Sequence, residues 1–338
     1  MKIEEVRGWL GLALCFLVAC TQRPTPSELA SPEKHPELIT QIPLPRSGYI
    51  YDVAIANGAA WVTSHGGLFR IDPVTSEAVK VLSHDYLFRA LPGYGDLWVT
   101  TGSGGQLLRF DPRTNTLDAE IDIGAGPVTE VAMSEDAVWV SAVSDLVRID
   151  PATNEVEDRM RSDTGFGDVT FGAGALWVIA GANEEGAVWR IDPATADVLQ
   201  KIPLPNPGFW NEMEAGDEAI WITSSPVARS NGAPFVRLHR IDPSTGEITA
   251  EVPLGNGAFG LGPDGRAQSL ATIAVGQGSV WVLIEIESLL VTVNPANLGA
   301  GETLEGVAGG SSDVGSGMAI GAGAIWVTAP GAVTRVTL

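Results

Sequence analysis

A short apolar run centred on tryptophan recurs seven times along the chain, at spacings of 37 to 60 residues. The runs read AAWVT, DLWVT, AVWVS, ALWVI, AIWIT, SVWVL and AIWVT, and contain Trp61, Trp98, Trp139, Trp177, Trp221, Trp281 and Trp326. β-branched and aromatic residues in short runs are typical of strands. The sequence is therefore built from a repeat, whose period defines the folding unit.

Each repeat offers four runs of strand length. The first precedes the tryptophan, as in VAIANGAAW, and the second contains it. The third ends in R-I-D-P-x-T, and the fourth follows that motif, as in EITAEVPL. Repeats of this length with four strands are typical of propeller blades. We therefore predict an all-β fold, a seven-bladed β-propeller of four-stranded blades over residues 37–338.

The last repeat ends after its third strand, at Leu338. A further strand-like run, ELITQIPL at Glu37–Leu44, lies just before the first repeat. We predict that this N-terminal strand closes the last blade, because such a closure leaves no open sheet edge there.

The R-I-D-P-x-T motif could mark a catalytic Asp150 or a turn. Pro suits the second position of a type I turn, and the preceding Asp can accept a backbone N–H two residues on. The same carboxylate recurs as Asp72, Asp111, Asp150, Asp192 and Asp242. One active site does not need five copies round a ring, so we predict turn-forming aspartates and tryptophans that pack between blades.

The N-terminal residues resemble the export signal of a bacterial lipoprotein. The run GWLGLALCFLVA is too short to span a bilayer stably, and it leads into Leu17-Val18-Ala19-Cys20, which resembles a lipobox. The resemblance implies a signal peptide at 1–19, lipid attachment at Cys20 and a Pro-rich tether at 20–36. A plain secretory signal or an N-terminal anchor helix is the alternative. We expect an exported, membrane-tethered protein, in the periplasm, at the outer membrane or at the cell surface, with the lipid as its only membrane contact.

The net charge of −21 argues against nucleic acid as a partner, because phosphates select basic surfaces. Of the two cysteines, Cys15 lies in the segment to be removed, so no disulfide is expected in the mature domain. We expect a monomer.

Charged residues recur nine positions before the tryptophans, at the top of each innermost strand. These positions hold Asp52, Arg89, Glu130, Asp168, Glu212, Thr272 and Gly317. Like charges round one channel mouth raise each other's pKa unless a cation or the arginine relieves them. We therefore predict a ligand-binding ring of Asp52, Arg89, Glu130, Asp168 and Glu212, able to take a divalent cation (Ca²⁺ or Mg²⁺), an amine or a sugar.

Two other interpretations of this region stay open. The carboxylates could cap neighbouring backbone N–H groups or face channel water. The nearby aromatic residues could offer a stacking surface or pack at blade edges; they are Tyr49, Tyr51, Phe88, Phe166 and Trp210. The most variable connections belong to blades 4–6, and include GNGAFGLGPDGRAQS at 255–269, so we predict that the top face around them binds the partner.

The pattern G-x-x-W-V…R-I-D-P-x-T-G-E resembles the virginiamycin B lyase-like and YVTN-type propeller repeats. The lyases are metal-dependent and eliminate across an ester, with a His in P-H-G-I-x and a Glu in W-F-T-E serving the metal and the base. The positions eleven residues before each tryptophan would carry that His. They hold Ile50, Leu87, Val128, Phe166, Trp210, Leu270 and Gly315, and the strands read WVTS, WVTT and WVSA, so neither residue is present.

Two functions follow as hypotheses. The first is a binding module that takes a small ligand or a protein on its top face. The alternative is a metal-dependent lyase or hydrolase of the virginiamycin B lyase-like type, with its site at the acidic mouth. No nucleophile, base and metal set is visible together, so no catalytic residue is assigned and enzymatic activity is left open.

Overall fold

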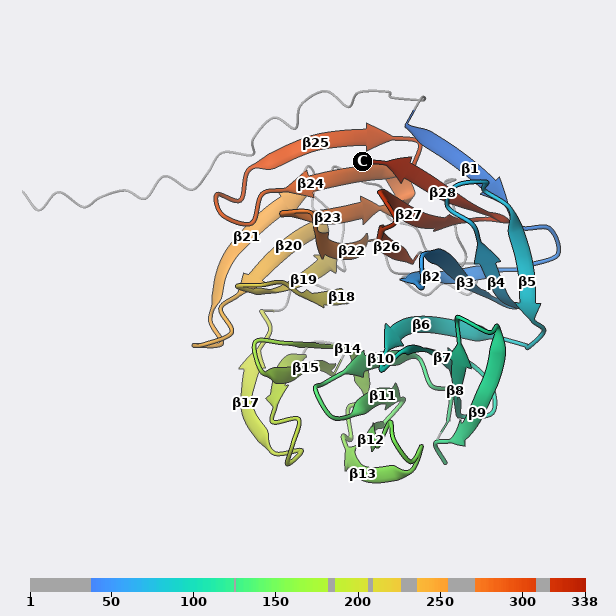
Figure 1. The fold of residues 1–338 in the computed structure, drawn as a ribbon. Coiled ribbons are helices and arrows are strands. Elements are labelled where there is room, and N and C mark those ends of the chain that lie inside the picture. Colours follow the sequence, from blue (N-terminus) through green and yellow to red (C-terminus); the bar gives the residue numbers. More distant parts are fainter. Residues whose placement is uncertain are drawn as a thin grey trace, which may run out of the picture.

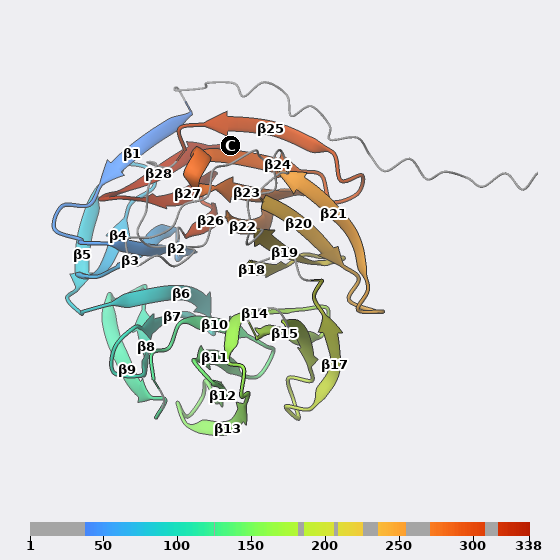
Figure 2. The same ribbon diagram turned by 180° about the vertical axis from the view of Figure 1, so that it is seen from behind.

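The computed structural model describes residues 38–124, 126–181, 186–205, 209–225, 236–254, 271–307 and 317–338. These residues form seven four-stranded antiparallel sheets. The sheets are arranged in a ring (Figure 1), and the view from behind shows the same ring (Figure 2). The predicted all-β, seven-bladed β-propeller is confirmed. In each blade the first strand lies nearest the centre of the ring (Figure 1).

The first four blades follow the chain in order. Blade 1 comprises β2 (Ile50–Ala56), β3 (Ala59–Ser64), β4 (Gly67–Ile71) and β5 (Ala78–Leu82). Blade 2 comprises β6 (Leu87–Gly93), β7 (Asp96–Thr101), β8 (Gln106–Asp111) and β9 (Thr116–Asp122). Blade 3 comprises β10 (Glu130–Met133), β11 (Val138–Ala142), β12 (Asp145–Ile149) and β13 (Val156–Arg161). Blade 4 comprises β14 (Phe166–Gly172), β15 (Ala175–Ala180), β16 (Ala187–Ile191) and β17 (Val198–Pro203).

The remaining blades complete the ring. Blade 5 comprises β18 (Phe209–Ala215), β19 (Ile220–Ser225), β20 (Val236–Ile241) and β21 (Ile248–Leu254). Blade 6 comprises β22 (Ala271–Gly276), β23 (Ser279–Ile284), the 3-10 turn η1 (Glu285–Glu287), β24 (Leu289–Val293) and β25 (Ala300–Glu305). Blade 7 comprises β26 (Met318–Gly321), β27 (Ala324–Ala329), β28 (Ala332–Thr337) and β1 (Ile39–Pro43).

Blade 7 takes its outer strand from the N-terminal end of the domain. β1 runs antiparallel to β28, with Ile39 opposite Val336 and Pro43 opposite Ala332. Ile42 is buried and packs in the cluster that joins blade 7 to blade 1. The two ends of the domain are therefore held in one sheet.

The recurring tryptophans pack between blades, as predicted. Trp61 of blade 1 lies edge-on against Phe110 of blade 2, with ring centroids 5.5 Å apart, and both belong to one buried cluster. The indole N–H usually donates to the carbonyl five residues earlier. These pairs are Trp61–Ala56, Trp98–Gly93, Trp177–Gly172, Trp281–Gly276 and Trp326–Gly321. These five tryptophans therefore fix their own hairpins, whereas the Trp139 indole N–H is buried without a hydrogen-bond partner.

The aspartates of R-I-D-P-x-T form turns, which confirms the prediction. The Asp72 carboxylate accepts the backbone N–H groups of Val74 and Thr75, at 2.8 and 2.9 Å. Asp111, Asp150, Asp192 and Asp242 accept the N–H two residues on in the same way. Asp150 is therefore a structural residue of the third-to-fourth strand turn.

The predicted signal peptide, Cys20 and the tether lie outside the described residues. In the part of the chain that the structure describes, no helix is long and apolar enough to span a bilayer.

Candidate functional site

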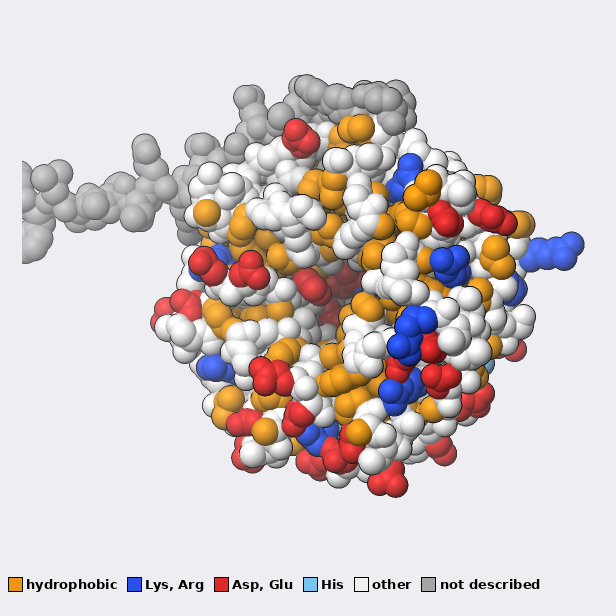
Figure 3. Space-filling model, viewed as in Figure 1, with side chains coloured by type: hydrophobic (Ala, Val, Ile, Leu, Met, Phe, Trp, Pro, Cys, Tyr) orange, Lys and Arg blue, Asp and Glu red, His pale blue; other side chains and the backbone are white. Residues whose placement is uncertain are grey.

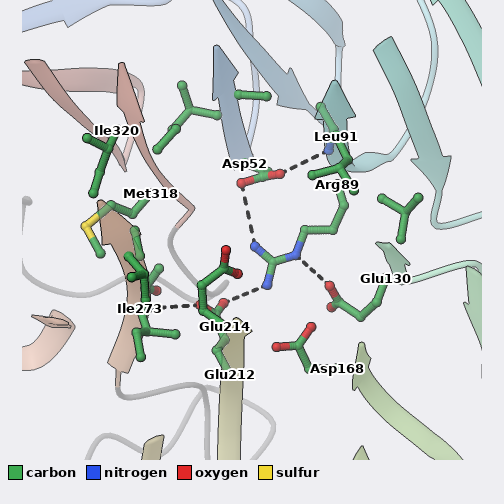
Figure 4. A pocket seen from close by; sticks show the side chains of 18 of the residues that line it. Asp52, Arg89, Leu91, Glu130, Asp168, Glu212, Glu214, Ile273, Met318 and Ile320 are labelled. Atoms are coloured by element: carbon green, nitrogen blue, oxygen red, sulfur yellow. Dashed lines mark hydrogen bonds and ion pairs between the residues drawn. The ribbon is translucent and has the colours of Figure 1, made fainter. Parts of the chain in front are cut away.

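The innermost strands bring all five predicted site residues to one cavity of ≈ 310 Å³. Asp52, Arg89, Glu130, Asp168 and Glu212 lie on β2, β6, β10, β14 and β18, respectively. Figure 3 shows the centre of the molecule hollowed, with acidic side chains inside it. Figure 4 shows Arg89 reaching into the midst of the carboxylates. Equivalent positions in five blades thus form a single site.

Breaks in strand pairing occur at four of these five positions. In β2, Ile50 pairs with Ser64 and Asp52 with Thr63, so Tyr51 is an extra, unpaired residue. By contrast, the pairing of β22, which carries the uncharged Thr272, is regular. Bulges bend a strand and re-aim its side chains, and they are common beside functional sites. The breaks lie next to or around Asp52, Arg89, Asp168 and Glu212.

Arg89 contacts three of the carboxylates. Its Nε lies 2.8 Å from Glu130 Oε2, its Nη2 lies 2.6 Å from Glu212 Oε1, and its Nη1 lies 3.6 Å from Asp52 Oδ1. Burial alone would lower the pKa of Arg89, but the charges of Glu130, Glu212 and Asp52 together raise it well above its ordinary value. The guanidinium therefore stays charged and joins blades 1, 2, 3 and 5.

Three of the carboxylates also accept backbone N–H groups from the next blade. Asp52 Oδ2 accepts from Ala90 at 3.0 Å, Asp168 Oδ2 from Met213 at 2.5 Å, and Glu212 Oε2 from Ile273 at 3.3 Å. The structure thus supports, for these three, the interpretation that they cap backbone groups. Among the described residues Glu130 accepts no backbone N–H from the next blade, and its hydrogen-bond partner is Arg89.

Glu214 is a sixth charged residue of the cavity that the repeat did not reveal. It lies two positions after Glu212 on β18 and therefore on the same side of the strand. Figure 4 shows its carboxylate inside the cavity. Within the described part of the chain it has no hydrogen bond or ion pair. Period-two alternation could have identified it, because Glu214 is the one charged residue among the seven positions that lie seven residues before a tryptophan.

The pKa values of the carboxylates reflect burial and mutual repulsion. Burial, followed by the charge of Glu212, raises the pKa of Glu214 to about 7. Burial likewise raises the pKa of Glu130 to about 7, with Glu212 adding to the rise and Arg89 opposing it. The pKa values of Asp52, Asp168 and Glu212 are also raised, chiefly by burial. Among the described residues, five carboxylates face one guanidinium, so the negative charge of the cavity exceeds the positive charge and favours protonation of the carboxylates.

The other wall of the cavity is apolar. It includes Ala54, Leu91, Ile273, Met318 and Ile320. In Figure 4, Met318 and Ile320 lie across Arg89 from Glu130. The cavity is therefore amphipathic, with an acidic side and an aliphatic side.

Two of the predicted aromatic residues lie in the core instead. Phe166 packs edge-on against Trp189, and Trp210 packs against His239, with centroids 5.5 and 4.8 Å apart. Both are buried, so for them the packing interpretation is the one observed. Tyr49, Tyr51 and Phe88 remain partly or largely exposed at the surface.

The most variable loops, at 182–185, 226–235 and 255–270, lie outside the described residues, so the prediction of a partner on these loops stays a prediction.

The metal chemistry implied by the lyase resemblance does not fit this cavity. Where the family would place histidines, the described positions hold buried or nearly buried apolar side chains, Ile50, Leu87, Val128, Phe166 and Trp210. The described residues that line the cavity include no histidine. We therefore derive no step through such a metal.

Comparisons with known proteins support the fold. No protein-family model matches the sequence, and no curated protein is similar to it in sequence. Hydrazine synthase from Kuenenia stuttgartiensis is similar in structure, with a TM-score of 0.68 and 12% identity over 87% of this chain and 96% of that one. The Pan2 WD40 domain of Neurospora crassa gives a TM-score of 0.67 and 10% identity, over 90% and 98%.

A third similar structure is the extracellular domain of a protein described as a hybrid two-component system in B. thetaiotaomicron. It gives a TM-score of 0.65 and 15% identity, over 88% of this chain and 39% of that one. At these identities the likeness is one of fold, and this chain is a seven-bladed β-propeller, a fold that commonly serves as a binding module.

Proposed function

We propose that the protein is a binding module that takes a small, positively charged ligand, a protonated amine, in the mouth of its channel. The observation that carries this proposal is the excess of carboxylates over cations in one cavity: among the described residues, five carboxylates and one guanidinium line it. In the same proposal, Cys20 carries a lipid, and residues 20–36 tether the propeller outside the cytoplasm.

The acceptors that remain free favour an ammonium group. Glu214 has no partner among the described residues, and Glu130 uses only Oε2 in its pairing with Arg89. An ammonium carries three donors and makes charge-assisted hydrogen bonds with carboxylates. The aliphatic wall formed by Met318, Ile320 and their neighbours would receive the carbon chain of the amine. The volume of ≈ 310 Å³ suits a small molecule.

A second candidate function, an enzyme of the lyase or hydrolase type, rests on one observation. The pKa values of Glu130 and Glu214 are both raised to about 7, which is the range that suits a general acid or base. Turnover of an amine-bearing ester or amide, lost in Glu130→Gln, would establish this function in place of simple binding.

The proposed function predicts charge-selective stabilisation. Hexylamine at a hundred times its Kd should raise the free energy of unfolding by about 2.7 kcal/mol, while hexanol, hexanoate, Ca²⁺ and Mg²⁺ should have weaker effects. Thermal unfolding of the purified protein with each compound measures this. Glu214→Gln should abolish most of the hexylamine effect, because it removes the free carboxylate.

Glu120→Gln is the matched control, since Glu120 is an exposed carboxylate on the outer strand β9. Equal stabilisation by hexylamine and hexanol, or an equal loss in the two variants, would contradict the proposed function. If a divalent ion stabilises the protein more than the amine does, the ligand is a metal.

A further inference from the structure

A group of aromatic side chains lies in the connections of blades 1 and 2, where the innermost strands β2 and β6 begin. The backbone N–H of His65 donates to Tyr49 O at 2.8 Å, and the N–H of Tyr86 donates to His65 O at 3.2 Å. These two backbone hydrogen bonds link Tyr49 and His65 of blade 1 to Tyr86, which lies just before blade 2. Tyr49 is 55% exposed and Tyr86 is 41% exposed, so both rings present aromatic surface to solvent.

The aromatic residues adjoin the candidate site along the chain. His65 packs edge-on against Tyr86, with centroids 4.2 Å apart, and Tyr51 packs edge-on against Phe88 at 4.7 Å. Tyr51 precedes Asp52, and Phe88 precedes Arg89. Tyr49 is three residues from Asp52, which amounts to roughly 10 Å along a strand. A ligand of two or three rings could therefore reach from the aromatic group into the carboxylates.

The backbone presents one of these rings under constraint. Tyr86 has a φ of 56°, a left-handed conformation that bulky residues seldom adopt. The N–H of Gly102 donates to Tyr86 O at 2.8 Å and helps to hold this conformation. Tyr94 shares this conformation, with a φ of 53°, so the φ of Tyr86 fixes the direction of its ring but does not by itself mark a binding site.

We infer that this aromatic group is a stacking subsite for a sugar ring, and that the ligand of the channel mouth is an oligosaccharide carrying amino sugars. The inference rests on the proposed function for its cationic part. The weakly positive C–H face of a pyranose packs on an aromatic face, whose π-cloud is negative. The phenol hydroxyls and His65 can bind sugar hydroxyls, while Glu214 and Glu130 take the ammonium.

The geometry disfavours the other ligands that aromatic residues recognise. A quaternary ammonium needs a cage with a gap between the rings, whereas these rings already touch in pairs. Nucleobases also stack on aromatics, but the phosphates they carry would meet a chain of net charge −21 and a mouth lined by five carboxylates. Acidic glycans are disfavoured for the same reason.

The test compares three probes by calorimetry on the purified protein. They are a glucosamine tetramer, the neutral cellotetraose and hexylamine. The native protein should bind the glucosamine tetramer at least about ten-fold more tightly than hexylamine, since one stacked ring contributes about this much. The Tyr49→Ala/Tyr86→Ala variant should lose about ten-fold in affinity for the tetramer and keep its affinity for hexylamine, which also shows that the variant is folded.

The matched control is Tyr94→Ala. Tyr94 is 39% exposed and lies after β6, at the opposite end of that strand from Leu87, and its removal should leave the binding of all three probes unchanged. If hexylamine binds but the double variant keeps full affinity for the tetramer, the stacking subsite is wrong and the proposed function stands. If cellotetraose binds as tightly as the glucosamine tetramer, with the same dependence on the tyrosines, the cationic function is wrong and the sugar subsite stands.

Discussion

Replacing Arg89 with methionine is expected to lower the free energy of unfolding by about 3–5 kcal/mol at pH 8. Arg89 pairs with Glu130, Glu212 and Asp52 in the cavity, and its side chain is only 24% exposed. Methionine fills a similar volume without a charge. The carboxylates then lose their counter-charge while remaining buried, which costs far more than the pairing itself contributes.

This loss should depend on pH. Without Arg89 the pKa values of the carboxylates rise further, so the folded state binds more protons than the unfolded state over a wider range. Stability therefore falls more steeply as the pH increases, and the loss is smaller at pH 5 than at pH 8. Urea unfolding of both proteins at the two pH values measures it.

Two variants give the controls. Arg89→Lys keeps the charge but cannot pair with three carboxylates at once, so an intermediate loss is expected. Arg113→Met removes an exposed arginine that pairs with Asp111 at 2.9 Å and should change stability little. A loss in Arg89→Met no larger than that in Arg113→Met would show that Arg89 does not hold the blades together.

Glu214→Gln is expected to stabilise the protein at pH 8. The pKa of Glu214 is raised from 4.5 to about 7 in the folded state, so between these values the folded state binds more protons than the unfolded state. The contribution of Glu214 to stability is therefore largest below pH 4.5 and is lost as the pH rises to about 7. Glutamine cannot ionise and avoids this loss. At about 1.4 kcal/mol per pKa unit, the gain is on the order of 3 kcal/mol.

The gain should be absent at pH 4.5, where Glu214 is largely protonated in the folded protein. Thermal unfolding of both proteins from pH 4.5 to 8 gives the difference as a curve that rises through this window. Glu218 is exposed in the turn of the same hairpin. The stability of Glu218→Gln should therefore follow that of the unmodified protein at every pH. If Glu214→Gln is instead less stable at pH 8, the Glu214 carboxylate makes a favourable contact in the folded protein. This result would contradict the claim that its oxygens are free to bind a ligand.

The fold could be predicted from the sequence because each blade repeats its own local determinants. The tryptophan and the turn-forming aspartate act within a few residues of their position in the chain, as the bonds of Trp61 to Ala56 and of Asp72 to Val74 show. The strand that completes blade 7 could be predicted for a related reason. The last repeat has only three strands, and the strand-like run at Glu37–Leu44 lies outside every repeat.

The membership of the site could be predicted, but its contacts could not. Counting back from the tryptophan works because the first two strands of each blade are joined without insertions. Which carboxylate meets Arg89, however, depends on the bulges and on the reach of the arginine side chain. The partners Ala90, Met213 and Ile273 contribute backbone N–H groups, and a backbone group leaves no mark in the sequence.

The aromatic residues show a further limit. Phe166 and Trp210 share a pattern position with Ile50 and Leu87, eleven before a tryptophan, and all four are buried at the start of an innermost strand. Tyr49 and Tyr51 lie one position to either side of that point and are not buried. One step along a strand moves a side chain to the opposite face. Proximity in sequence to the site therefore could not distinguish buried aromatic side chains from exposed ones.

The central claim, a cation site made of carboxylates that ionise only near neutral pH, is tested most directly by the pH dependence of amine binding. Hexylamine stays protonated throughout, so a change in its affinity between pH 5.5 and pH 8 reports the protein. Since the pKa values of Glu130 and Glu214 are both about 7, calorimetry should show affinity at least about ten-fold tighter at pH 8. Protons should be released on binding at pH 5.5, where these carboxylates are protonated before the amine binds. An affinity that is the same at both pH values, or no binding at either, would contradict the claim.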